Sequence, residues 1–280
     1  VVLLVLIGGD AARAAAVLPP LRVTHFDAGQ ANAALVELGP TRLVIDTGRG
    51  GDADAAARIL VPYLASIGAA RVDAIFVTHP QFDHAGGLEG LLRDVKVGSI
   101  WTNGDPADAA FFRRALRSAR ERGVPVRVVK RGDQITGLPG GARLRVLHPG
   151  VYFARRDDLN ERSLVLLLEA HGKKFLWTGD IGEEGLADLL MAEKLPQVDV
   201  LQVPHHGSKA GVNAIELLSR TRPDIAVISC GRDNRYGHPH PTTLEALHQT
   251  ARQIHRTDRQ GALQTTHTRD GRESHLRAGD

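Results

Sequence analysis

Two histidines and one aspartate lie within six positions of one another in the first half of the chain. The segment reads Thr78-His79-Pro80-Gln81-Phe82-Asp83-His84-Ala85-Gly86-Gly87. Imidazole nitrogens and carboxylate oxygens are ligands of Zn²⁺ and Mn²⁺ in proteins. On a turn the adjacent side chains of Asp83 and His84 diverge, so they can serve different metals, or a metal and a proton. Taken alone, the segment is better explained by surface histidines that cap a helix.

Two further polar clusters follow other apolar segments. Asp180 comes directly after Trp177-Thr178-Gly179, and His205 and His206 lie in the segment Val203-Pro204-His205-His206-Gly207-Ser208. In open α/β sheets, chemistry gathers at the carboxyl ends of strands. Because the three clusters all follow apolar segments, residues that are distant in sequence can meet there. Together the clusters predict a metal site.

The elements that must position these clusters are short strands alternating with helices. Alternating or continuous apolar runs predict strands over 21–26, 33–38, 42–46, 72–77, 164–168, 174–177, 198–203 and 225–229. Apolar residues at helical spacing predict helices over about 54–67, from near 88 onward, and over 183–192. The pattern therefore favours an α/β protein in which buried strands end at the polar clusters.

The composition excludes several classes of protein. The chain has 280 residues, of which 42% are hydrophobic, so it can fill a sizeable core and its body is not intrinsically disordered. A single cysteine, Cys230, excludes an intramolecular disulfide framework and a Cys-rich zinc site. The 35 Lys and Arg against 32 Asp and Glu permit a polyanionic partner without requiring one. Aromatic residues, at 4%, supply few side chains for a base-stacking platform.

Three segments of the chain differ in composition. Residues 1–20 begin with an apolar run of seven residues, far short of the roughly 20 that span a bilayer. We expect this run to be the truncated end of a signal peptide or of a membrane helix, with a short hydrophobic first strand as the alternative. Pro19 and Pro20 mark the boundary with a folded domain over 21–267. The polar residues 268–280 are expected to form a frayed tail.

Five ordered motifs accompany the first cluster. They are His25-Phe26-Asp27-Ala28-Gly29-Gln30, Asn160 with Ser163-Leu164-Val165, Trp177-Thr178-Gly179-Asp180, Pro204-His205-His206-Gly207-Ser208 and Asn234-Arg235-Tyr236-Gly237-His238-Pro239. This set resembles the metallo-β-lactamase superfamily and, within it, the C-terminal domain of the ComEC competence proteins. The resemblance extends from about residue 21 to 267. It implies an α/β fold that is a four-layer αβ/βα sandwich, with two facing mixed β-sheets and helices outside.

The resemblance also implies which residues bind metal. His79, Asp83 and His84 match the metal motif of the superfamily, and Asp180 matches a carboxylate that bridges two metals. Asp46 matches an aspartate that contacts the metal ligands and not the metal itself.

One histidine of the second pair should complete the site. We expect His205 to be this ligand, because it lies nearer the end of the strand, and His206 to be either the alternative ligand or a group that orients phosphate or water.

Several positions depart from the family pattern. Gln81 stands where the family has His or Asp, and a neutral amide is a poor metal ligand. Asn160 stands where many members have a histidine, and the opening loop reads Asp27-Ala28-Gly29-Gln30-Ala31-Asn32-Ala33 instead of D-V-G-Q-G-D-A. We therefore expect one or two divalent ions, Zn or Mn. The favoured arrangement is a single-metal site formed by Asp83, His84, Asp180 and His205, with a second metal held weakly at His79. A catalytically silent copy of the domain is the alternative.

The chemistry expected of such a site is hydrolysis. A divalent ion lowers the pKa of bound water and polarises a phosphoryl or carbonyl oxygen. Asp83 and Asp180 are the predicted catalytic carboxylates. His238, in a Gly-His-Pro turn, is the predicted acid for the departing oxygen, and a loop histidine bonded to the backbone is the alternative.

Other residues are predicted to contact the substrate. Ser208 with the neighbouring backbone amide, Asn160 and Asn234 are the candidates near the site. Within 111–131 the chain has eight basic residues and one acidic residue, and Arg113 and Arg117 fall on one face of a helix. This strip can follow a phosphate backbone, and a solvated arginine-rich helix is the alternative.

The resemblance implies a metal-dependent hydrolase, a nuclease or phosphodiesterase acting on DNA during competence-type uptake. The expected partner is single-stranded DNA, with a membrane channel region upstream in the full-length protein. The expected location is extracytoplasmic, that is, periplasmic or attached to a bacterial membrane. A small-molecule ester hydrolase of the phosphocholine esterase or lactonase type, and a non-catalytic DNA-binding module of an uptake channel, remain alternatives.

Overall fold

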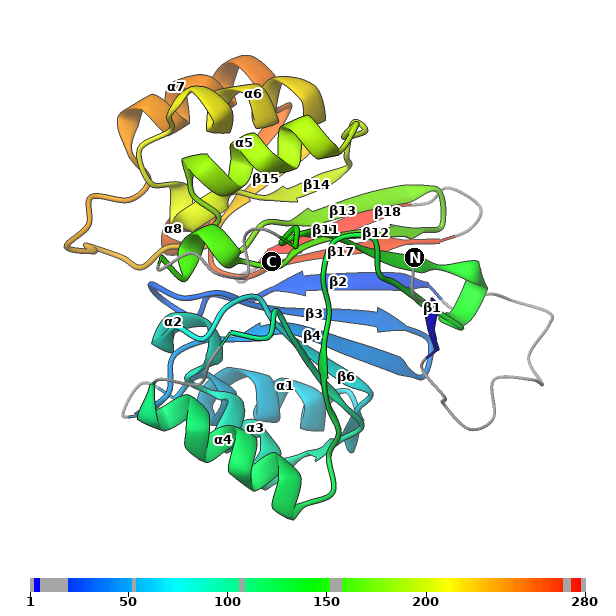
Figure 1. The fold of residues 1–280 in the computed structure, drawn as a ribbon. Helices are drawn as coiled ribbons and strands as arrows, with labels where there is room; N and C mark the ends of the chain where they lie inside the picture. Colours follow the sequence, from blue (N-terminus) through cyan, green and yellow to red (C-terminus); the bar gives the residue numbers. More distant parts are fainter. Residues whose placement is uncertain are drawn as a thin grey trace.

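Two large β-sheets face each other in the computed structural model, and helices cover the outer face of each sheet (Figure 1). The structure describes residues 3–5, 20–51, 54–105, 109–151, 158–268 and 273–277. The order of layers is helix, sheet, sheet, helix. The predicted four-layer αβ/βα sandwich with mixed sheets is therefore confirmed.

The first sheet contains the N-terminal strands and the last two strands of the chain. Its order within the described residues is β18 (Glu273–Arg277), β17 (Leu263–His267), β2 (Leu21–His25), β3 (Ala33–Leu38), β4 (Thr41–Thr47), β6 (Ala74–Val77), β8 (Ile100–Thr102) and β9 (Val126–Val128). The strands from β18 to β4 pair antiparallel, and those from β4 to β9 pair parallel. A small separate sheet pairs β5 (Arg71–Val72) with β7 (Lys96–Val97).

The second sheet has the same mixed character. Its order within the described residues is β1 (Leu3–Val5), β10 (Gln134–Thr136), β11 (Arg143–His148), β12 (Val165–Ala170), β13 (Lys173–Trp177), β14 (Val200–Gln202), β15 (Ile225–Ile228) and β16 (Gln253–Arg256). The strands from β13 to β16 are parallel. Parallel strands need crossover helices, and these supply the outer layer.

The helices divide between the two outer faces. Those of the N-terminal half are η2 (Ala56–Leu60), α1 (Val61–Ser66), α2 (Phe82–Ala85), α3 (Leu88–Asp94) and α4 (Ala110–Glu121). Those of the C-terminal half are α5 (Glu183–Ala192), α6 (Val212–Thr221), α7 (Pro241–Thr250) and α8 (Thr257–Gln260), and short turns are η3 (Pro139–Gly141), η5 (Asn160–Arg162) and η6 (Pro204–Gly207). Figure 1 shows α1, α3 and α4 on one side of the sandwich and α5, α6 and α7 on the other.

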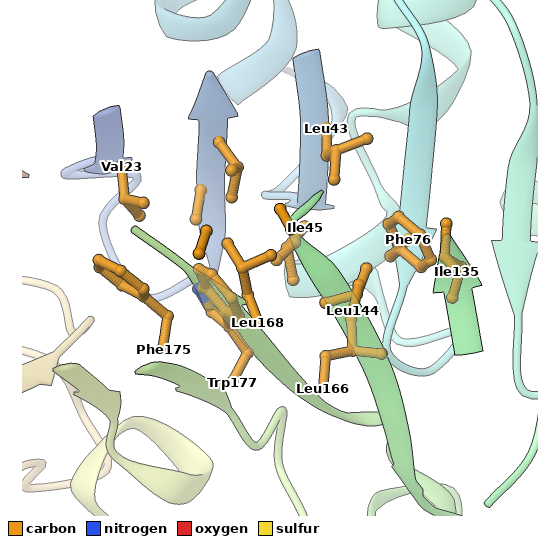
Figure 2. Close-up of a cluster of buried hydrophobic side chains, with 14 of the residues drawn as sticks. Val23, Leu43, Ile45, Phe76, Ile135, Leu144, Leu166, Leu168, Phe175 and Trp177 are labelled. Atoms are coloured by element: carbon orange, nitrogen blue, oxygen red, sulfur yellow. The ribbon is translucent and has the colours of Figure 1, made fainter. Parts of the chain in front are cut away.

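The core lies in three layers, because each sheet is buried on both faces. Between the sheets, Phe76 and Ile45 of the first sheet face Leu144, Leu166 and neighbouring residues of the second (Figure 2). One further apolar cluster joins the first sheet to α1, α3 and α4, and another joins the second sheet to α5, α6 and α7. Strands that are covered on both sides need continuous apolar runs, which explains why the sequence shows such runs before the polar clusters.

The predicted elements differ from the structure in a few places. The strand expected over 72–77 is divided at Asp73, whose carboxylate accepts a hydrogen bond from the Arg42 amide at 2.9 Å. The helix expected over about 54–67 begins with a turn of π-helix, η2, before α1.

The ends of the chain also differ from expectation. The polar segment 268–280 was expected to fray, but β18 (Glu273–Arg277) pairs antiparallel with β17 at the edge of the first sheet. This edge strand is exposed on all its residues, and besides its backbone pairing its Glu273 side chain forms an ion pair with Lys173 of β13. Within the apolar run at the start of 1–20, Leu3–Val5 form β1, parallel to β10, which is the short first strand named as the alternative; residues 1–2 and 6–19 lie outside the described residues.

Candidate metal centre

The polar clusters meet at one edge of the sandwich, where parallel strands of both sheets end. Asp46 lies at the end of β4, His79 follows β6, and Asp83 and His84 lie in α2. From the second sheet, Asp180 follows β13, and the neighbouring histidine pair lies in η6 after β14. The two halves are tied together here, since the Leu164 amide donates to the Thr78 carbonyl at 2.8 Å.

Four side chains form a compact group: Asp83, His84, Asp180 and His206. One ligand atom from each lies within 4.8 Å of the others. His84 Nε2 is 3.1 Å from Asp180 Oδ1, and His206 Nε2 is 3.4 Å from both Asp83 Oδ2 and Asp180 Oδ2. Two residues come from each half of the chain, so the group exists only in the folded sandwich.

The atoms that converge in this group lack other partners. The Nε2 atoms of His84 and His206 and the Oδ1 atom of Asp180 are buried, and among the described residues their polar contacts are with other members of the group. Two carboxylates and two histidines buried together at such distances need a charge arrangement that holds them in place. Two imidazole nitrogens and two carboxylates are suitable ligands for Zn²⁺ or Mn²⁺. The residues present therefore fit a divalent cation.

Asp46 holds His84 in the orientation that a ligand needs. His84 Nδ1 lies 2.7 Å from Asp46 Oδ2, and Asp46 also accepts hydrogen bonds from the Thr78 amide and hydroxyl, both at 2.8 Å. Because the Asp46 carboxylate accepts the Nδ1 proton, the lone pair of Nε2 points toward the group. Such an aspartate behind a histidine fixes the tautomer of the ring and raises its basicity.

His206 is oriented in the same way by the backbone. Its Nδ1 donates to the Ser229 carbonyl at 2.8 Å, which leaves Nε2 free to accept or to bind metal. His205 and His206 have φ values of 50° and 56°, and Asp46 has 57°, so three non-glycine residues at this edge occupy the left-handed region. Such strain persists only where the surrounding structure holds it.

The electrostatics of the group are those of a site built around positive charge. Burial alone would raise the pKa of Asp180, but His206 and His84 hold it well below its usual value. Burial would likewise lower the pKa of His84 and His206, but the nearby carboxylates raise the pKa of His84 well above normal and that of His206 to about 9. Burial raises the pKa of Asp83, yet His206 and His84 bring it down to about 2. Both carboxylates are therefore ionised and ready to bind a cation.

Comparison with known proteins agrees with this geometry. Residues 26–232 match the Metallo-beta-lactamase superfamily. The chain belongs to this superfamily. It is 35% identical over 209 residues to ComE operon protein 3 of Bacillus subtilis (strain 168). The aligned region covers 74% of this chain and 26% of that protein. The chain is 28% identical over 253 residues to Recombination protein 2 of Haemophilus influenzae and 31% identical over 245 residues to Competence protein ComA of Neisseria gonorrhoeae.

These matches confirm the resemblance to the ComEC-type competence proteins. The region aligned with Recombination protein 2 covers 90% of this chain and 29% of that protein. The region aligned with Competence protein ComA covers 86% of this chain and 32% of that protein. The chain thus spans about a quarter to a third of the length of the curated relatives it matches. The chain is therefore a member of the metallo-β-lactamase superfamily with a four-residue group that could hold a metal ion.

Solved structures show the same fold at low sequence identity. The metallo-β-lactamase fold protein YhfI from Bacillus subtilis aligns with a TM-score of 0.56 at 10% identity, covering 92% of this chain and 100% of that chain. The CmlA β-hydroxylase E377D mutant aligns with a TM-score of 0.55 at 14% identity, covering 92% of this chain and 54% of that chain. Within the described residues, no helix has both the length and the apolar character needed to cross a membrane.

His79, the first residue of the superfamily motif, lies next to the four-residue group but is not a member of it. The ring of His79 is 4.1 Å from that of His84, centroid to centroid, and its Nδ1 lies 3.1 Å from the Thr78 hydroxyl and 3.3 Å from the Ser163 hydroxyl. Burial and the neighbouring His84 lower the pKa of His79 to about 3, so the ring is neutral. Its Nε2 is buried and makes no hydrogen bond within the described residues, as a ligand of a second ion would be.

The two amides that depart from the family pattern differ in their surroundings. The Gln81 carbonyl accepts hydrogen bonds from the amides of His84 and Ala85, at 3.1 and 2.8 Å, so its backbone starts α2. Asn160 lies in η5, three residues before Ser163, and its Oδ1 is buried with no hydrogen-bond partner in the part that the structure describes.

The structure reverses the order of preference between the two adjacent histidines. The His205 side chain is 36% exposed and its Nε2 lies 3.7 Å from Asp180 Oδ2, whereas His206 is almost fully buried within the group. The geometry thus favours His206 over the expected His205 as the fourth member of the group, and the choice of ligand stays a prediction. The reason is local: both residues have left-handed φ values, so the chain turns at η6 and directs the second ring, not the first, toward the carboxylates.

His238 lies beside the group and has a defined hydrogen bond. The Gln30 side chain accepts from the Gly231 amide at 3.0 Å through Oε1, so its Nε2 faces His238 Nδ1 at 3.3 Å. The His238 ring centroid is 6.0 Å from that of His205 and 6.4 Å from that of His206. Burial and these neighbouring rings lower the pKa of His238 to about 4.

The predicted substrate-binding residues occupy different places. The Asn234 amide donates to the carbonyls of Gly231 and His238 and accepts from the His238 amide, so Asn234 shapes the loop that positions His238. Ser208 lies in a small pocket beside His205, and its carbonyl accepts from the Thr243 hydroxyl.

The predicted basic strip lies on α4. Arg113 and Arg117 are exposed on this helix, in the layer outside the first sheet. They are therefore not part of the four-residue group.

Sequence reasoning assigned no role to several residues that complete the site. Gln30, Thr78, Ser163 and Ser229 orient the histidines through the contacts described above. Three of these residues could have been found from their position in the sequence, because Thr78 precedes His79 and both Gln30 and Ser163 lie inside the motifs quoted above. Ser229 had no such signal, because its backbone carbonyl makes the contact.

Proposed function

We propose that the chain is a metal-dependent phosphodiesterase that cleaves DNA, serving as the nuclease part of a competence-type uptake protein. The observation that supports this proposal is the group Asp83, His84, Asp180 and His206, in which one ligand atom from each residue lies within 4.8 Å of the others and three of the residues are buried. The similarity to competence proteins supports DNA as the substrate. A place outside the cytoplasm is part of the same proposal.

The four residues of the group would hold one divalent ion. When bound, such an ion activates water for attack and polarises a phosphoryl oxygen. Asp180 would be the central ligand, because its two oxygens face His84 on one side and His206 on the other. Asp46 and the Ser229 carbonyl keep the two ring nitrogens directed inward.

His238 supplies a hydrogen-bond donor beside the ion. Because the Gln30 amide donates to Nδ1, the neutral ring holds its proton on Nε2. A neutral imidazole in this tautomer donates from Nε2 to a phosphate oxygen or to the departing oxygen. The expected acid is therefore a neutral donor positioned by Gln30 and not an imidazolium.

A basic pocket next to His238 also suits a polyanion. It has a volume of about 550 Å³ and is lined by Arg232, Arg256 and Arg259 together with Asp258 and the 233–239 loop. Arg256 is paired with Asp258 at 2.6 Å, whereas Arg232 and Arg259 are exposed. Two exposed guanidinium groups within reach of the site can hold the phosphates that flank the cleaved bond.

The proposal is tested by cleavage of an end-labelled single-stranded oligonucleotide after the protein is loaded with Mn²⁺ or Zn²⁺. We expect cleavage that requires metal and that is abolished in Asp180→Asn and in His206→Ala. Asp133→Asn is the matched control, because Asp133 is a buried carboxylate that accepts a backbone hydrogen bond far from the group. Folding of each variant is checked by circular dichroism.

Two results would contradict the proposal. Turnover of small esters by the metal-loaded protein, with no cleavage of DNA, would identify a small-molecule hydrolase. Binding of DNA by a folded protein that takes up no metal and cleaves nothing would identify a non-catalytic module of an uptake channel.

A further inference from the structure

Among the residues that the structure describes, two exposed aromatic rings lie in segments next to the candidate metal centre. Of the Phe, Tyr and Trp side chains that the structure describes, only Phe82 and Tyr236 are more than a third exposed, at 37% and 53%. The other described aromatic rings are buried or half-buried. A single exposed ring is ordinary on a protein surface, so the contacts around these two rings carry the argument.

Phe82 stands on the N-terminal side of the centre. It is the first residue of α2 and directly precedes the ligand Asp83. The edge of its ring meets Phe111 of α4 at a centroid distance of 5.1 Å, and the guanidinium of the exposed Arg49 lies over the ring at 5.7 Å. The ring is therefore braced by a neighbour and held beside the site.

Tyr236 stands on the C-terminal side of the centre. Its ring stacks on His238 with an interplanar angle of 28° and a centroid distance of 5.6 Å, and His238 in turn stacks on the ligand His206 at 23° and 6.4 Å. The guanidinium of the exposed Arg235 lies over the Tyr236 ring at 5.0 Å. Three nearly parallel rings thus lead from the metal group to solvent.

The two sides share an exposed ring with an exposed arginine over it; Phe82 directly precedes the ligand Asp83, and Tyr236 is linked to the ligand His206 through His238. Aromatic rings that stack on bases, together with arginines that pair with phosphates, are the means by which proteins bind single strands without regard to sequence. Bases within a duplex are already stacked on one another and cannot reach such rings. The arrangement therefore fits an unpaired strand that passes across the centre.

We propose that Phe82 and Tyr236 are base-stacking platforms that hold unpaired nucleotides on either side of the candidate metal centre. When a base stacks on each ring, Arg49 and Arg235 leave the rings and pair with neighbouring phosphates. This inference rests on the proposed function and narrows its substrate to single-stranded polynucleotide. It also explains how a chain with few aromatic residues can still bind single strands: the rings are few but are placed at the site.

The test compares two oligonucleotides that have the same backbone charge. One is a fluorescein-labelled single strand of about 12 nucleotides, and the other has abasic linkers in place of its central nucleotides. Both contain phosphorothioate linkages that slow hydrolysis, so binding to the metal-loaded protein is measured by fluorescence anisotropy without cleavage. Hydrolysis of bis(p-nitrophenyl) phosphate, which contains no base, is measured separately and reports on the proposed function alone.

We expect the wild-type protein to bind the base-containing strand at least about fivefold more tightly than the abasic strand, since one base stacked on an aromatic ring contributes at least that factor. Tyr236→Ala and Phe82→Ala should each remove about fivefold or more from the affinity for the base-containing strand and leave the affinity for the abasic strand nearly unchanged. Tyr236→Phe keeps the ring and should bind as the wild type does. Met191→Ala, a change at a residue that is 82% exposed on α5, is the matched surface control.

The two strands separate the possible outcomes. Equal affinity of the wild type for both strands, or an equal loss for both strands in Tyr236→Ala, would overturn the inference, because the ring would then not contact a base. Hydrolysis of bis(p-nitrophenyl) phosphate together with equal affinities would leave the phosphodiesterase intact and refute only the stacking platforms. A preference for the base-containing strand without any hydrolysis would support the platforms and refute the phosphodiesterase.

Discussion

The hydrogen bond between Asp46 and His84 should control the affinity of the site for metal. Asp46 is completely buried and uses its two oxygens for three contacts, with the Thr78 amide, the Thr78 hydroxyl and His84 Nδ1. In Asp46→Asn one oxygen becomes an NH₂ group, which can only donate. If the remaining oxygen accepts from His84, the NH₂ group faces the Thr78 amide donor; if it accepts from Thr78, the NH₂ group faces His84 Nδ1.

The size of the effect follows from the length and burial of this contact. A buried hydrogen bond to a charged group contributes about 1.5–3 kcal/mol, and at 2.7 Å the bond between His84 and Asp46 is short. Since each 1.4 kcal/mol is a factor of ten in a binding constant, we expect the dissociation constant for metal to rise about 10- to 100-fold. Asp46→Asn should also lower the free energy of unfolding of the metal-free protein by about 1–3 kcal/mol.

The assay is competition for Zn²⁺ against a chromophoric chelator, with urea unfolding of the metal-free protein in parallel. Asp133→Asn is the control, because the buried Asp133 carboxylate accepts a hydrogen bond from the Lys130 amide at 3.0 Å but contacts no member of the metal group. This control should lose stability and keep its affinity for metal. If Asp46→Asn binds Zn²⁺ as tightly as the wild type, Asp46 does not orient His84 for metal and the reasoning is refuted.

Three other perturbations test separate parts of the structure. Elemental analysis should find about one metal per chain in His205→Ala but almost none in His206→Ala, and the opposite result would restore the first histidine as the ligand. Burial, with a smaller contribution from the neighbouring His255, lowers the pKa of His25 to about 3, so the unfolded chain binds a proton there that the folded chain does not. Stability should therefore fall as the pH drops below 6.5, by about 2 kcal/mol between pH 8 and pH 5 from this residue, and urea unfolding of His25→Leu should show a pH dependence that is weaker by this amount. If the α4 strip contacts DNA, charge reversal at Arg113 and Arg117 to Glu should weaken binding and flatten its dependence on salt concentration, and an unchanged slope would show that the strip does not contact the backbone.

Local pattern was sufficient for much of the fold. The predicted strand over 33–38 and the helix over 183–192 coincide with β3 and α5, because continuous burial and helical spacing are visible in the residues themselves. The separation of β5 from β6 at Asp73 was not visible, because it depends on a hydrogen bond to Arg42 in another strand. The facing of the two sheets came from the resemblance to a family and not from periodicity.

For the site, the types of ligand were predictable and their final orientation was not. Asp83, His84 and Asp180 follow buried strands, so the tendency of strand ends to meet at one edge was enough to bring them together. The choice between His205 and His206 depends on two consecutive left-handed φ values, which residues with side chains rarely adopt and which no local pattern indicates. The close approach of α2 to the loop after β4 was not predicted; it requires glycine at position 86, where a Cβ atom would lie 2.4 Å from the Gly50 amide nitrogen.

The departures at Gln81 and Asn160 lie outside the four-residue group and leave it complete. A copy of the domain that had lost its metal would gain stability by filling this space with apolar side chains, since replacing buried charged groups is often neutral or stabilising. The protein instead keeps the ionised carboxylates of Asp83 and Asp180, and the buried Nε2 atoms of His84 and His206 face them. Burying an ionised group such as Asp180 costs several kcal/mol, a large fraction of the roughly 5–15 kcal/mol by which domains are stable. A cation bound by all four residues offsets this cost, and this is the physical reason to expect a working metal site here.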